Sequence, residues 1–303
     1  MKRRLGLVVF VLVALVAACA DLLASDLPLY CEVEGHGYWL PCITRPPALR
    51  SDDQQGLETR ASRLVHTPIP YGPLAQRPGG RLEVLVAPSA AHWLGTDDRG
   101  RDVAARLIHG TRVACLVGPL AVALYLFIGV VVGTTCAASK RFDRVASRFI
   151  EAGMTLPTLV LLLVIQGLSG RGRVIDVSLA IALAEWAYAA RLVRAEALRV
   201  AASEHVMAAR SLGARASRVM ARHILPLALG PALVLASFGL GQAILFESAL
   251  GLLGYGIAPP TASWGELLAQ AMAHPRAWLI APPAIIIGLV VLASRLVADD
   301  DPS

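Results

Sequence analysis

The residues best placed to do chemistry in this sequence lie between Glu204 and Pro226, in the stretch EHVMAARSLGARASRVMARHILP. Apolar residues recur there every three or four positions, a spacing typical of an amphipathic helix, while arginines gather on another face. Gly213 interrupts the pattern. Because glycine costs about 1 kcal/mol relative to alanine inside a helix, we expect a joint between two short helices. Small residues beside the joint predict a docking surface for another protein, whereas the simpler alternative is a basic loop that only contacts anionic lipid headgroups.

A second polar stretch, HWLGTDDRGRDVAARLIHGTRVACLVG, runs from His92 to Gly118. Gly95 to Asp98 read as a turn into a helix cap, and Val103 and Leu107 follow at helical spacing. The Asp and His residues could suggest a metal site, but they lack a recognisable ligand spacing. We therefore expect a capped interfacial helix.

Two carboxylates, Glu185 and Glu247, fall inside apolar stretches. Ionisable groups inside a membrane usually face a partner or a water-filled cavity. Glu185 lies six residues before Arg191, so its simplest interpretation is that it reaches the cytoplasmic interface. Glu247 would either line a path or make a helix-packing hydrogen bond. After it come GYG, with Tyr255, and APPTASWG, whose Trp264 suits either a gate-side re-entrant segment or an interfacial anchor.

Motifs of known enzymes are missing from the chain. It has no Gly-x-Ser-x-Gly and no His-Glu-x-x-His, and neither of its lysines, Lys2 and Lys140, stands in a phosphate-binding loop. A polytopic membrane enzyme therefore remains a weak alternative, and this chain is expected neither to catalyse a reaction nor to hydrolyse ATP. A self-sufficient secondary transporter is a third interpretation, although it predicts repeated halves that the sequence does not show.

The composition predicts that these residues are held by membrane helices. The chain is 56% hydrophobic and 17% charged, with a mean hydropathy of +0.60, which excludes an ordinary soluble protein. An all-α integral membrane protein with six spans is expected, since a helix needs about 20 apolar residues to cross a bilayer. The predicted spans are Leu5–Ala20, Val113–Ser139, Ala152–Gly170, Val174–Ala190, His223–Phe246 and Ala277–Ser294.

The distribution of positive charge predicts the orientation of these spans. Fifteen Lys and Arg fall in the short segments on one side and three on the other, so the positive-inside rule places both termini in the cytoplasm. The N-terminal residues could instead be a cleaved signal peptide, since Val16 to Cys19 resemble a lipoprotein cleavage site.

The expected organisation has four parts. Residues 1–24 form the first span, residues 25–112 an external loop with the interfacial helix, residues 113–298 a five-helix core with the cytoplasmic loop 191–225, and residues 299–303 a tail. Alternation from Leu29 to Ile43 predicts a short hairpin in the external loop. Cys31 and Cys42 lie there, and they are either a disulfide or free thiols.

The motifs together resemble a family. MAARSLGARASRVMARHILP is similar to the cytoplasmic loop of permease subunits of ATP-binding cassette (ABC) importers, although Met207 stands where that pattern usually has Glu. HWLGTDDRGRD, FDRVASRFIEAGMTLPTLVLLLVI, WAYAARLVRAEAL and GYGIAPPTASWGELLA look like the second permease of dipeptide and oligopeptide importers. The resemblance runs in order from about His92 to Val297.

The resemblance implies a permease of the bacterial inner membrane that works by alternating access and binds no cofactor itself. Its implied partners are a second homologous permease, two cytoplasmic ATPase subunits that bind ATP and Mg²⁺, and an external solute-binding protein. From their positions, the residues expected at the path or gate are Glu247, Tyr255 and Trp264. Di- and oligopeptides are the commonest cargo, while nickel complexes, sugars and peptide antibiotics stay open. The implied coupling-helix residues, which dock on the ATPase, are Met207, Ala208, Ala209, Leu212, Gly213, Ala214 and Ser217.

Overall fold

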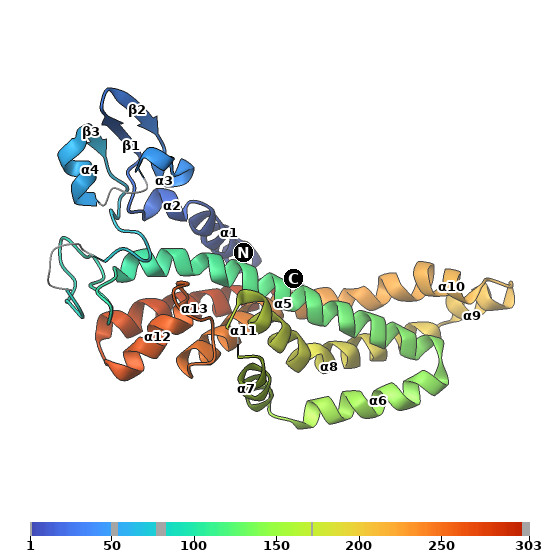
Figure 1. Cartoon of the computed structure of the whole chain (residues 1–303). Helices are drawn as coiled ribbons and strands as arrows, with labels where there is room; N and C mark the ends of the chain where they lie inside the picture. Colours follow the sequence, from blue (N-terminus) through green and yellow to red (C-terminus); the bar gives the residue numbers. More distant parts are fainter. Residues whose placement is uncertain (1, 50–53, 77–82, 171, 299–303) are drawn as a thin grey trace. The chain divides into compact units, whose positions relative to one another are not determined.

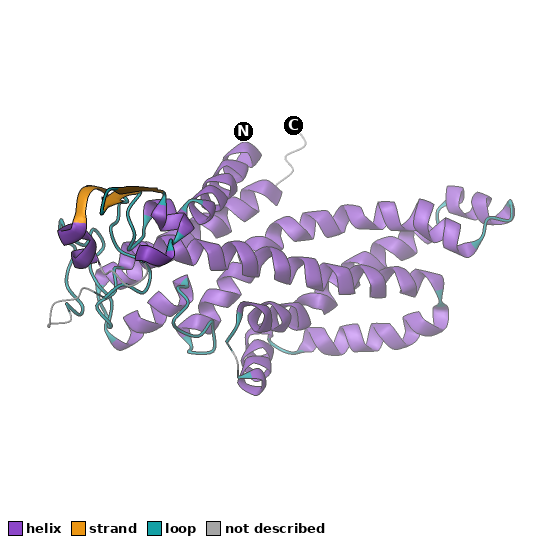
Figure 2. Ribbon diagram, turned by 45° about the horizontal axis from the view of Figure 1, so that its top comes forward, coloured by secondary structure: helices purple, strands orange, loops and turns teal. Residues whose placement is uncertain are grey.

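The chain is mostly helical in a computed structural model that describes all residues except 1, 50–53, 77–82, 171 and 299–303 (Figure 1). It divides into two compact units. Unit 1 comprises Met1–Leu7, Val117–Phe246 and Val291–Ser303, and unit 2 comprises Val8–Leu116 and Glu247–Val290. Figure 2 shows the strands gathered in one small sheet, with helices making up nearly all the remaining regular structure.

Unit 2 contains the only sheet among the described residues. Strand β1 (Tyr30–Val33) pairs antiparallel with β2 (His36–Trp39) and with β3 (Ala61–Val65), in the order β2-β1-β3. Glu34 and Gly35 both have positive φ, which suits the two-residue turn of a tight hairpin. The predicted hairpin is therefore confirmed, and β3 is an addition that the sequence did not reveal.

A small core supports this sheet. Cys31 and Cys42 are both buried in it, beside Leu49 and Leu57. Both cysteines are free thiols, which decides between the two alternatives left by the sequence. Burial raises the pKa of each thiol above its ordinary value, so both stay protonated at neutral pH.

Short helices complete the N-terminal part of the chain. After α1 (Lys2–Ala18) come α2 (Ala20–Leu23), α3 (Pro41–Thr44), the 3₁₀ turn η1 (Pro47–Leu49) and α4 (Gln54–Arg60). Within unit 2, Arg112 donates hydrogen bonds to the Ala17 carbonyl oxygen at 2.8 Å and to Asp21 at 2.8 Å. The charge of Arg112 in α5 is thus neutralised by Asp21 of α2.

The long helices are α5 (Val103–Ala138), α8 (Val174–Ala201), α11 (Leu225–Leu252) and α13 (Ala277–Ala298). By length and composition, three helical segments of the described chain can cross a membrane: Val103–Ala138, Ala216–Leu252 and Ala277–Ala298. The expected spans Leu5–Ala20 and Val174–Ala190 coincide largely with α1 and α8, and their crossing stays a prediction. The expected interfacial helix is not separate, because α5 runs through Arg112 without a break.

The predicted span Ala152–Gly170 was wrong as a single helix. Helix α6 (Lys140–Thr155) ends before Leu156 and Pro157, and α7 (Thr158–Ser169) leaves at 93° to it. Proline removes a hydrogen-bond donor and forces the preceding residue out of the helical region, and Leu156 is indeed extended, with ψ 134°. The pair is a fourth span only if it counts as one broken helix, and both members pack on α8.

Candidate functional site

The loop between α8 and α11 lies in unit 1 and has a buried side and an exposed tip. It contains α9 (Glu204–Ser211), α10 (Ala216–Val219) and the π-helical turn η2 (Met220–Ile224). Val206 and Val219 are buried, one from each short helix, and they pack with Val200 and Ile224 in one apolar cluster. The two helices are therefore held from behind by the ends of α8 and α11.

The tip of this loop presents apolar side chains to the outside. Leu212 is 89% exposed, and Met207 on the preceding turn is also exposed. Of the other expected coupling-helix residues, Ala209 and Ala214 are half-buried, whereas Ala208, Gly213 and Ser217 are exposed. A leucine this exposed, flanked by Arg210 and Arg215, forms an apolar point within a basic surface.

The predicted joint at Gly213 is confirmed. Helix α9 ends at Ser211, Leu212 caps it, and Gly213 adopts a positive φ of 81° that only glycine takes without strain. The Ala214 N–H then donates to the Ala209 carbonyl oxygen and closes the turn. A Cβ at Gly213 would meet no neighbour within 4 Å, so crowding is not what requires glycine here. The positive φ of the backbone is the reason.

At the far end of the loop, Pro226 lies in the first turn of α11. The chain is helical from Ala216 to Leu252, and Pro226 lies inside this run, just after η2. The Leu225 N–H donates to the Met220 carbonyl oxygen, five residues back. A wide turn of this kind fits beside a residue that has no N–H to donate.

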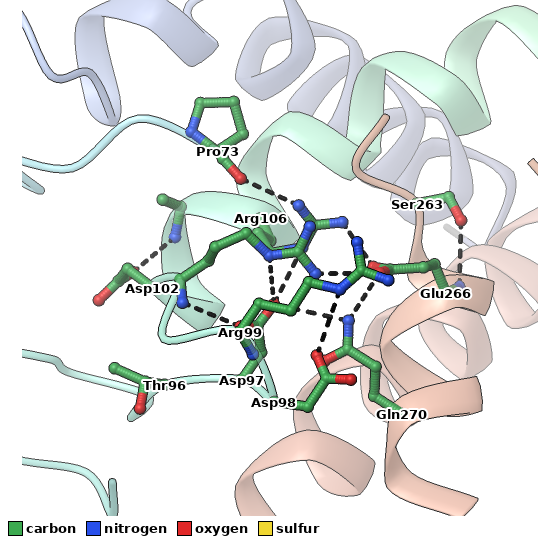
Figure 3. Close-up of polar contacts among 12 residues, drawn as sticks. Pro73, Thr96, Asp97, Asp98, Arg99, Asp102, Arg106, Ser263, Glu266 and Gln270 are labelled. Carbon is green, nitrogen blue, oxygen red and sulfur yellow. Dashed lines mark hydrogen bonds and ion pairs between the residues drawn. The ribbon is translucent and has the colours of Figure 1, made fainter. Parts of the chain in front are cut away.

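A buried polar cluster in unit 2 joins the start of α5 to α12 (Trp264–Ala273) (Figure 3). The Arg101 Nε lies 2.7 Å from Asp97 Oδ2, and the Arg101 Nη2 lies 3.0 Å from Glu266 Oε1. Arg106 contacts the same two acids, at 2.5 Å to Glu266 and 3.6 Å to Asp97. Gln270 donates to Glu266 at 2.6 Å. Two cations thus balance two anions in a site that is almost closed to solvent.

Next to this cluster, Asp102 caps α5. Its Oδ1 accepts a hydrogen bond from the Ala105 N–H at 2.8 Å, and its Oδ2 lies 2.8 Å from His92 Nδ1. His92 also stacks on Tyr71. The cap therefore comes four residues later than the Gly95–Asp98 turn. Burial and the neighbouring Asp97 raise the pKa of Asp98.

The expected path residues lie in unit 2. Trp264 is buried, its Nε1 donates to the Leu107 carbonyl oxygen at 3.0 Å, and Gly110 leaves room for its ring. Glu247 is also buried and accepts a hydrogen bond from the neighbouring Ser248 of the same helix. Tyr255 is exposed. A path role for these three residues stays a prediction.

Sequence reasoning missed a cavity in unit 1. It has a volume of about 230 Å³ and lies between α5, α8, α11 and α13. Its polar lining residues are Tyr125, Glu185, Gln242, Ser294 and Arg295. Glu185 therefore faces this cavity. The sequence signal that could have indicated this cavity is Gln242, a polar residue inside an apolar run. It lies four residues after Phe238, which also lines the cavity.

Comparison with known proteins identifies the class. Residues 127–299 match the family described as "Binding-protein-dependent transport system inner membrane component". This match covers more than half of the chain, so the chain belongs to that family of ABC importer permeases, which are multi-pass membrane components.

Individual relatives agree with this family. A protein of Brucella suis biovar 1 named as a peptide permease is 38% identical over 220 residues, covering 70% of this chain and 72% of its own length. The dipeptide transport system permease protein DppC of Alkalihalophilus pseudofirmus is 34% identical, covering 73% of each chain. A solved chain of the MetNI methionine ABC transporter in an inward-facing conformation shares the fold, with a TM-score of 0.51 and 18% sequence identity. The match covers 63% of this chain and 94% of the MetNI chain.

Proposed function

We propose that this chain is a permease subunit of an ATP-driven peptide importer and that the α9–α10 loop is its docking site for a separate ATPase subunit. The observation that carries the proposal is the exposed Leu212 on a turn fixed by Gly213 and anchored by buried Val206 and Val219. An exposed apolar side chain on a rigid support is what a docking surface needs, because little ordering entropy remains to be lost on binding.

The proposed docking residues are those expected from the sequence: Met207, Ala208, Ala209, Leu212, Gly213, Ala214 and Ser217. Small residues at most of these positions let a partner's backbone approach closely, while Leu212 and Met207 supply apolar contact area. Movement of the ATPase subunits would then push α8 and α11 as rigid bodies and open the path alternately to the two sides.

Peptide is the substrate class that the relatives support, since the similar proteins of Brucella suis and Alkalihalophilus pseudofirmus carry peptide-transport names. A second permease would complete the path, two ATPase subunits would bind ATP and Mg²⁺, and an external binding protein would deliver the solute. This chain itself would be non-catalytic and would bind no cofactor. The distribution of arginines supports cytoplasmic termini in the inner membrane.

Cross-linking tests the docking site. Cysteine is introduced at Ala209 or at Leu212, rather than at Gly213, where a side chain would be strained. We expect both variants to cross-link to a P-loop ATPase subunit in native membranes. The control is Trp39→Cys, also highly exposed but on β2, which should not cross-link to that subunit. Absence of the cross-link in both folded variants, with uptake that persists after ATP depletion, would favour a secondary transporter.

A further inference from the structure

We propose that the cavity between α5, α8, α11 and α13 is a binding subsite for a small zwitterion, an amino acid or a dipeptide, with Glu185 facing its ammonium group and Arg295 its carboxylate. The inference rests on the proposed transport function and adds a place and a recognition chemistry for the cargo. All residues concerned belong to unit 1.

The first argument is the size of the cavity and the mixed character of its lining. Its volume of about 230 Å³ far exceeds the roughly 15 Å³ that one water needs. Its walls mix polar groups with apolar side chains such as Phe238 and Leu235. This combination, apolar walls with a few convergent polar groups, is that of a small-molecule site.

The second argument is the state of the two charges. Glu185 and Arg295 line the same cavity from different helices, yet they form no ion pair with each other. Glu185 has a hydrogen bond with Thr158, and no hydrogen bond or ion pair of Arg295 is found within the described part of the chain. A carboxylate and a guanidinium that do not pair with each other suit a ligand that carries one charge of each sign. Ionisable residues within membrane helices also typically mark substrate pathways.

The third argument is that close helix contacts hold the walls. A Cβ at Gly239 of α11 would fall 1.8 Å from the Tyr125 hydroxyl oxygen, so this glycine lets the phenol of α5 lie against α11. A Cβ at Gly241 would fall 2.2 Å from the Ser294 hydroxyl oxygen of α13. The Ser294 hydroxyl already donates to the Val291 carbonyl oxygen, so its hydrogen is not available to a ligand. The polar side chains that remain for a ligand are Tyr125, Glu185, Gln242 and Arg295.

The test measures binding of alanyl-phenylalanine to the transport complex purified through a tag on this chain, in nanodiscs and without the external binding protein. Three probes are compared: the free dipeptide, its N-acetyl derivative and its C-terminal amide. We expect each modification to weaken binding to the wild-type complex by at least about tenfold, because each removes one charged partner.

The variant Glu185→Gln links the effect to one residue. In it, N-acetylation should no longer weaken binding, while C-terminal amidation should still do so; Arg295→Gln should show the reverse. The control Glu151→Gln changes an exposed carboxylate of α6 outside this cavity and should behave like the wild type.

Equal binding of all three probes by the wild-type complex would overturn the inference without any variant. An N-acetylation effect of the same size in wild type and Glu185→Gln would overturn it as well, as would ATP-driven uptake without measurable dipeptide binding. Failure of the proposed function is distinguishable, since the wild-type complex with its binding protein would then show no ATP-driven uptake in proteoliposomes.

Discussion

At the scale of single residues, the buried cluster around Arg106 is the feature with the largest energetic consequence. Its two arginines and two acids are balanced, and every charge has a partner. Arg106 is fully buried, and its Nη1 also donates to the Pro73 carbonyl oxygen at 2.9 Å. Removal of one member therefore leaves a buried charge without compensation, which costs far more than loss of a surface pair.

Arg106→Ala should accordingly destabilise the chain by about 3–5 kcal/mol. The matched control is Arg99→Ala, because Arg99 is 51% exposed and its ion pair with Asp98 is long, at 4.0 Å. That variant should lose no more than about 1 kcal/mol. Thermal unfolding of the detergent-purified proteins measures both, and equal transition temperatures for the two variants would contradict the importance assigned to the cluster.

The sequence indicated only half of this cluster. Arg101 and Arg106 stood out beside a predicted helix, and Asp97 in the turn before it. Glu266 lies 160 residues after Arg106, and no periodicity connects the two. A tertiary pair at such a separation depends on how α12 folds back onto the start of α5, which composition and spacing do not specify.

At the scale of elements, α5 and α8 approach closely at two glycines. A Cβ at Gly129 would lie 2.5 Å from the Ala189 Cβ, and one at Gly133 would lie 2.7 Å from the Arg194 backbone nitrogen. Near these contacts, Arg194 of α8 also binds Asp143 of α6 through two hydrogen bonds. Small residues at helix contacts provide packing where lipid supplies no hydrophobic driving force.

Gly133→Val should therefore separate α5 from α8 and destabilise the chain by about 1–3 kcal/mol. Gly288→Val serves as the control, since Gly288 of α13 is exposed and a Cβ there meets nothing within 4 Å. The comparison is made on detergent-purified protein by thermal unfolding and by susceptibility to limited proteolysis. A destabilisation at Gly288 as large as at Gly133 would argue against this contact.

Element boundaries show where sequence reasoning stops. The joint at Gly213 could be predicted because glycine disfavours a helix interior and readily adopts the positive φ of a helix end. The 93° bend at Pro157 could not, because it lies inside an apolar run that is long enough to cross a membrane. Proline alone does not distinguish a mild kink from a right-angle turn. Both α6 and α7 also pack on α8, and such tertiary contacts are not specified by the sequence pattern.

At the scale of the whole molecule, the fold class and the membrane location could be predicted from composition, because long apolar runs have few alternatives. The cavity with Glu185 and Arg295 could not be predicted, since its polar lining residues come from four different helices, α5, α8, α11 and α13. The orientation rests on arginine distribution alone and is open to a direct test.

Cysteines at two exposed positions test that orientation. Trp39 is 77% exposed on β2 and Leu212 is 89% exposed in the α9–α10 loop. A membrane-impermeant maleimide added to intact cells should label Trp39→Cys and should label Leu212→Cys only after permeabilisation. The wild type is the background control, because its Cys31 and Cys42 are buried. Labelling of Leu212→Cys from outside would reverse the proposed topology.

Co-purification tests the docking role of the α9–α10 loop most directly. The proteins that co-purify with the tagged wild type are compared with those that co-purify with Leu212→Asp and with the control Trp39→Asp. Both substitutions replace highly exposed apolar residues, so neither should impair folding. Mass spectrometry should find a P-loop ATPase and a second permease with the wild type and the control, and should find the ATPase lost from Leu212→Asp while the permease remains. Retention of the ATPase at wild-type level in Leu212→Asp would contradict the proposed docking site.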